Sequence, residues 1–105
     1  MATAQELYED LVTEHLVQPG VSMGRMFHAE ALQVRGKVYA FYSKERVILK
    51  LPAARAAELV GEGTAEVMQM GARRMREWVA LRDPDEAVWR RLMTEAATYV
   101  ASLIR

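Results

Sequence analysis

The fold of this chain is decided by the stretch GKVYAFYSKERVILKL, which covers residues 36–51. Within it, β-branched and aromatic side chains gather in two short runs, Lys37–Ser43 and Arg46–Leu51. Side chains of this kind favour strands, and the intervening Lys44-Glu45 has the length of a hairpin turn. Because a connection this short joins antiparallel neighbours, the stretch predicts two adjacent antiparallel strands.

Two further runs on the N-terminal side extend this hairpin into a meander of four strands. They are Val21–Phe27 and Glu30–Arg35, separated from each other by His28-Ala29. Gly36 separates the second of them from the hairpin, so these connections are also short enough for antiparallel neighbours. A fifth strand is predicted over Arg74–Leu81, whereas residues 67–70 are left open between a loop and a brief strand.

A first helix is expected before the strands. Thr3 and Glu6 have the spacing of a capping box, in which a hydroxyl and a carboxylate satisfy amide donors at a helix start. Apolar residues then recur at three- and four-residue spacing to about Val17, and Pro19-Gly20 ends the pattern.

Two more helices follow the meander. One is predicted from Ala53 to about Val60, with Pro52 at its first position and Gly61 just past its end. The other opens at Asp83–Glu86, read as a capping box with a proline at its first helical position, and extends almost to the C-terminus. The order α-β-β-β-β-α-β-α predicts an α+β fold, a two-layer arrangement of an antiparallel-dominated sheet flanked by helices.

Composition indicates one domain over residues 1–105, because 105 residues of which 51% are apolar can bury a core of their own. Cysteine is absent from the sequence, which excludes a disulfide framework, a thiolate zinc site and a cysteine nucleophile. The N-terminus lacks the pattern of a signal peptide, and no apolar run approaches the ~20 residues of a membrane span. We therefore expect a cytoplasmic protein without a membrane partner.

Groups that could carry chemistry are few. The sequence contains no phosphate-binding loop and no zinc-ligand spacing. His15 and His28 have no carboxylate or hydroxyl at a spacing that suggests a relay, so they are interpreted as an edge and a turn histidine. We expect no catalytic residues, no metal, no cofactor and no enzymatic activity.

The formal net charge of zero conceals a division along the chain. Residues 1–20 carry four acids and no base, whereas residues 21–82 carry eleven bases against six acids. The predicted sheet is therefore basic and the first helix acidic. Carboxylates of the helix could pair with these bases across a solvated edge, or one face of the sheet could present a positive platform to an anionic partner.

Strand alternation makes the second alternative specific, because alternate side chains share a face. One face would then collect basic and aromatic side chains from three strands: Tyr39, Phe41, Arg46, Lys50, Arg74, Arg76 and Trp78, together with Ile48. Such interleaving is typical of surfaces that stack single-stranded nucleic acid. It equally describes an apolar layer covered by a helix or a second subunit. The candidate binding surface consists of Arg25, Lys50, Arg74, Arg76 and Trp78.

Four blocks of the sequence, in order, are Met23–Phe27, Gly36–Phe41, Val47–Pro52 and Met75–Val79. Their order and spacing resemble the TfoX/Sxy N-terminal domain family, to which YjbR-like proteins are related, over nearly the whole chain. The resemblance implies a helix-flanked antiparallel sheet, a link to the regulation of competence genes and no catalytic residues. Many members carry a pair of glycines where His28-Ala29 stands here, and full-length members add a C-terminal domain.

The expected function is that of a small non-catalytic binding or regulatory domain of the TfoX N-terminal type, acting through protein partners. Self-association as a homodimer is also expected, because a pI near 6.7 leaves little charge repulsion between copies. The alternative is a nucleic-acid-binding module that uses the basic and aromatic face of the sheet.

Overall fold

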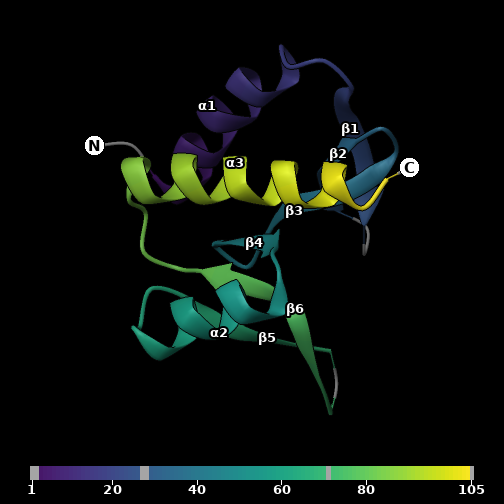
Figure 1. The fold of residues 1–105 in the computed structure, drawn as a ribbon. Helices are drawn as coiled ribbons and strands as arrows, with labels where there is room; N and C mark the ends of the chain where they lie inside the picture. The colour runs from purple at the N-terminus through teal and green to yellow at the C-terminus, as the bar shows by residue number, and fades with distance from the viewer. Residues whose placement is uncertain (1–2, 27–28, 71, 105) are drawn as a thin grey trace.

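The structure is a computed structural model that describes residues 3–26, 29–70 and 72–104. Its nine elements run in the order α1 (Ala4–Leu16), β1 (Val21–Met26), β2 (Ala29–Val34), β3 (Lys37–Ser43), β4 (Arg46–Lys50), α2 (Ala53–Gly61), β5 (Glu66–Met70), β6 (Arg73–Leu81) and α3 (Glu86–Ser102). Figure 1 shows α3 lying across the sheet, with α1 beside it and α2 against the β5–β6 end. The predicted α+β class is confirmed.

The six strands form one open antiparallel sheet in the order β1-β2-β3-β4-β6-β5. The four-strand meander is as predicted, with ends that differ by a residue; Phe27 and His28, and with them the expected turn, lie outside the described residues. Residues 66–70 form a strand because they pair with β6, from Glu66↔Ala80 to Met70↔Arg73. The last strand along the chain, β6, lies between β4 and β5.

Two tight turns hold the meander in register. Arg35 and Gly36, between β2 and β3, have φ of 49° and 84°. Lys44 and Glu45, between β3 and β4, have φ of 54° and 62°. Positive φ at both central residues matches the right-handed twist of the flanking strands, and glycine adopts it without strain. The Lys44-Glu45 turn is the strained one, because both of its residues carry a Cβ.

Helix starts differ from the sequence prediction at both prolines. Pro52 has ψ of 143°, so it caps α2 from outside, and α2 extends through Gly61. Asp85, with φ of −139° and ψ of 108°, is the N-cap of α3 and accepts a hydrogen bond from the amide of Val88. The predicted box at residues 83–86 is therefore wrong, because Asp85 is still extended and helical geometry begins at Glu86. The capping box of Thr3 and Glu6 is confirmed.

The main core lies between the sheet and the three helices. Its largest fully buried side chain is Trp89 of α3, which packs in one cluster with Leu11 of α1, Leu59 of α2 and Leu49 of β4. Of the helices in the described ranges, none is long and apolar enough to cross a membrane.

A second, smaller cluster lies on the other face of the sheet. It consists of Ala31, Phe41, Ile48 and Ala80, each at most 2% exposed, and it is built from strand residues alone within the described part of the chain. Met26, Val38, Met68 and Trp78, also from strands, pack around it. This face therefore shields its own apolar centre without a covering helix.

Tyr39 does not join this second face. The pairing of β2 with β3 shifts between Leu32↔Ala40 and Gln33↔Val38, so Tyr39 is the extra residue of a bulge. It is fully buried in the main core, on the helix-covered side. The expectation that Tyr39 and Phe41 share a face is wrong because strand alternation is broken at this bulge.

Candidate functional site

Two of the five predicted surface residues, Lys50 and Trp78, lie directly opposite each other on β4 and β6. The Lys50 ammonium is 5.8 Å from the centre of the Trp78 ring, and that ring is 5.9 Å from the Phe41 ring at 59°. Lys50 also lies 3.9 Å from the Glu77 carboxylate. The positive charge of Lys50 is therefore partly neutralised beside the aromatic side chain.

The other three predicted residues belong to β1 and β6. Arg76 is exposed on β6, near Trp78 in the chain. Arg25 is in β1, at the far edge of the sheet. It precedes Met26, which packs on the second cluster, so strand alternation places Arg25 on the opposite face of the sheet. Arg74 belongs to β6, but its side chain lies outside the described part. Of the four predicted residues whose side chains are described, the structure brings Lys50 and Trp78 into direct contact and places Arg25 on a different edge of the sheet.

A stacking platform for bases would need several accessible rings. On this face Phe41 is only 2% exposed, and Tyr39 lies in the opposite core. Among the aromatic residues expected on this face, Trp78 alone is partly exposed. The geometry therefore offers basic side chains around one ring rather than a row of stacking sites.

A groove runs between α2 and β6, with a volume of about 630 Å³. Trp78 and Arg76 line one side of it, and Ala53 and Ala57 of α2 line the other. It thus contains two of the predicted surface residues, but in a different setting from the flat basic face that strand alternation suggested.

An irregularity in the sheet makes room for the groove. The pairing of β5 with β6 passes from Val67↔Val79 directly to Met68↔Met75, so residues 76–78 of β6 fall between consecutive pairs. On the helix side, Ala53, Ala57 and Gly61 follow one another at four-residue spacing and all line the groove. This small-residue spacing is the one sequence signal that could have pointed to the site.

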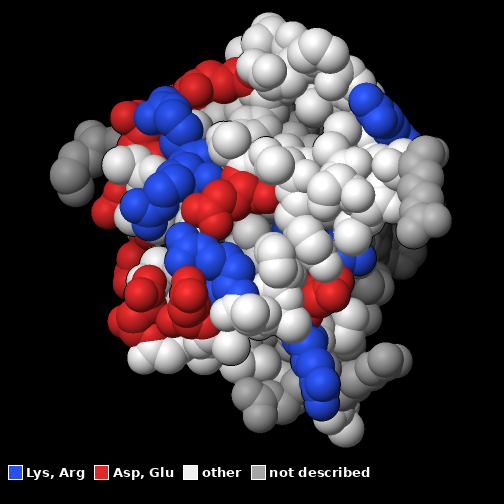
Figure 2. Space-filling model, in the orientation of Figure 1, with Lys and Arg blue, Asp and Glu red and all other residues white. Residues whose placement is uncertain are grey.

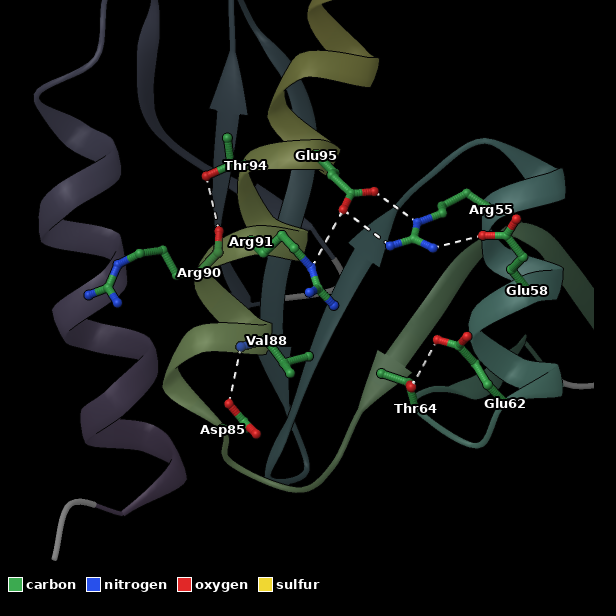
Figure 3. Close-up of polar contacts among 10 residues, drawn as sticks. All are labelled: Arg55, Glu58, Glu62, Thr64, Asp85, Val88, Arg90, Arg91, Thr94 and Glu95. Carbon is green, nitrogen blue, oxygen red and sulfur yellow. Dashed lines mark hydrogen bonds and ion pairs between the residues drawn. The ribbon is translucent and has the colours of Figure 1, made fainter.

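Polar contacts on its other side hold α2 in place. The Arg55 guanidinium donates hydrogen bonds to Glu95 of α3, at 2.9 Å from Nε, and to Glu58 at 2.7 Å, and Figure 3 shows Arg55 reaching between the two helices. Arg91 lies 3.9 Å from the same Glu95 carboxylate. These contacts fix the helix that forms the groove wall.

The histidine expected at an edge is buried. His15 is 8% exposed, and its Nδ1 lies 2.7 Å from the hydroxyl of Tyr39. Burial holds the pKa of His15 below its ordinary value, with the Glu14 carboxylate acting in the opposite direction. Burial also raises the pKa of Tyr39, so both partners are kept uncharged near neutral pH.

Tyr8 and Glu14 act electrostatically on this pair. The Tyr8 hydroxyl is buried without a hydrogen-bond partner in the described ranges, and its ring stacks on Tyr42 at 5.3 Å. Within those ranges no group of three or more His, Asp or Glu side chains could hold a metal ion.

Glu14 of α1 pairs with a helix and not with the sheet, which differs from one of the sequence hypotheses. Glu14 accepts two hydrogen bonds from Arg90 of α3, at 3.0 and 2.7 Å. Figure 2 shows charged side chains gathered over the N-terminal part of α3 and over α2, whereas the area over the C-terminal end of α1 is mostly white, with blue atoms at its right edge.

Exposed apolar side chains belong to that uncharged end. Val17 is 78% exposed and Leu103 53%, and Leu16 and Met23 are also exposed. These four, called the uncharged end below, are the exposed large hydrophobic residues of the described chain. They come from the end of α1, from the edge strand β1 and from the residue after α3. Exposed large apolar side chains of this kind are candidates for a protein interface.

Comparison with protein-family models, with curated proteins and with solved structures finds no match for the chain.

Proposed function

We propose that the protein is a small non-catalytic binding domain of the TfoX N-terminal type, which exerts a regulatory role through protein partners in the cytoplasm. The observation that carries the proposal is the uncharged end, where Val17, Leu103 and Met23 are exposed while the charged residues gather elsewhere. A partner that covers apolar surface and removes it from water lowers the free energy.

A second copy of the chain is one such partner. The uncharged end includes Met23 of β1, an edge strand of the sheet, and an edge strand can pair with a strand of another chain. Two copies can meet through this surface without bringing like charges together, since its four residues carry none. This supports the homodimer proposed from the near-neutral charge.

The proposal is tested with Val17→Asp, which places a charge at the most exposed of the four residues, 78% exposed, without disturbing a buried residue. The matched control is Gln5→Asp, which adds the same charge at an exposed position in the first turn of α1. Light scattering at micromolar concentration should give a dimer mass for the unmodified protein and the control, and a monomer mass for Val17→Asp.

Affinity capture from the native cytoplasm, with and without nuclease, extends the test to other partners. A protein that is retained after nuclease, retained by the control and lost with Val17→Asp is the expected result. Identical capture by both variants would contradict the proposed surface. Material that disappears with nuclease, and whose binding weakens steeply with salt, would favour the nucleic-acid alternative instead.

A further inference from the structure

We propose that the groove between α2 and β6 binds a small amphipathic monoanion, a compact apolar body that carries a single carboxylate or comparable anionic group. This site is separate from the uncharged end and adds a small-molecule ligand to the protein-binding role. The volume of about 630 Å³ lies within the ~300–1,000 Å³ that ligand pockets occupy.

The walls select an apolar body. Nine of the ten lining residues have apolar side chains or, in the case of Gly61, none. Trp78 and Val79 of β6, the former partly exposed, line one side. The small side chains of α2 leave the space open on the other, and a Cβ added at Gly61 would meet no atom within 4 Å. An alkyl chain or an aromatic ring could therefore enter without displacing the backbone.

One positive charge selects the head group. Arg76 is exposed and, among the side chains that the structure describes, is the only charged one that lines the groove. Within the described part of the chain its guanidinium has no acidic partner, whereas the nearby Lys50 is engaged with Glu77. A guanidinium presents paired donors that match a carboxylate, so an anionic head group at the mouth of the groove would pair with Arg76.

Three probes with the same eight-carbon chain separate the two parts of the proposal: octanoate, octanol and octyltrimethylammonium. Binding is followed by NMR through the two indole N–H signals. Trp78 lines the groove and should shift on titration, whereas Trp89 is only 1% exposed in the main core and serves as the internal control. Octanoate should bind most tightly, and its affinity should rise by up to about fourfold for each added methylene until the groove is full.

Variants locate the site and assign the charge. Ala57→Leu should abolish the Trp78 shift by filling the groove, whereas Ala54→Leu, an exposed position on the same helix that does not line it, should leave the shift intact. Arg76→Gln should weaken octanoate by about three- to fivefold, to the level of octanol.

Two results would overturn the proposal in different ways. If octanol binds as tightly as octanoate and Arg76→Gln changes neither, the groove is an apolar site without charge selection. If none of the probes moves the Trp78 signal at millimolar concentration, or Ala57→Leu leaves the shift unchanged, the groove is not the site. Neither result tests the protein-binding role, which is measured separately with Val17→Asp.

Discussion

Ile48→Ala tests whether the helix-free face of the sheet is a packed layer or an open platform. Ile48 is 1% exposed and lies between Phe41 of β3 and Ala80 of β6. Truncating such a side chain removes apolar burial and leaves a cavity, which costs about 2–5 kcal/mol. Because the cluster is covered by side chains of strands alone, its neighbours can close part of the cavity, and we expect about 2–3 kcal/mol.

This loss is measurable against a total stability of about 5–15 kcal/mol. Urea unfolding followed by circular dichroism should show it, and the melting temperature should fall by about 10–20 °C. Ile48→Val should cost about 0.5–1.5 kcal/mol, and Val17→Ala, at a position 78% exposed, should stay within about 0.5 kcal/mol. A loss below about 0.5 kcal/mol for Ile48→Ala would refute the packed layer.

Two further substitutions test a strained turn and a buried histidine. Glu45→Gly should raise the free energy of unfolding by about 1 kcal/mol, because it relieves a left-handed conformation at φ of 62°. The control Glu62→Gly, at φ of −89°, should bring no gain in the free energy of unfolding. An equal gain at both positions would argue against the strain. Burial lowers the pKa of His15 below its ordinary value of 6.5, so the unfolded chain is protonated first, and urea unfolding should show stability falling as the pH drops through 6.5. His15→Leu should flatten that part of the profile, and an unaltered slope would exclude His15 as its cause.

Local sequence signals predicted most of the elements correctly. The β3–β4 hairpin follows from two β-prone runs joined by two residues, and the start of α1 follows from the spacing of Thr3 and Glu6. These features depend on residues close together in the chain, which is why they can be recognised without knowledge of the fold. The helix starts at Pro52 and Asp85 were misplaced by a residue or two because several neighbouring residues can serve as a cap.

Predictions that relied on strand alternation held only as far as the next bulge. The pairing of Lys50 with Trp78 follows the expected alternation, but the bulge at Tyr39 turns that ring into the opposite core. A bulge is produced by pairing with another strand, so it cannot be recognised from the residues of one strand alone. The same holds for residues 76–78, which have no pairing partners in β5 and therefore leave space for the groove.

What the sequence by itself determined is the set of helices and antiparallel hairpins and the absence of cysteine chemistry, because each depends on residue type and short spacing. Only the tertiary structure decided that β6 lies between β4 and β5, that His15 meets Tyr39 twenty-four positions away, and that Arg76 faces α2 across a groove. These are contacts between segments distant in the chain, and they are selected by packing of the whole core rather than by any local preference.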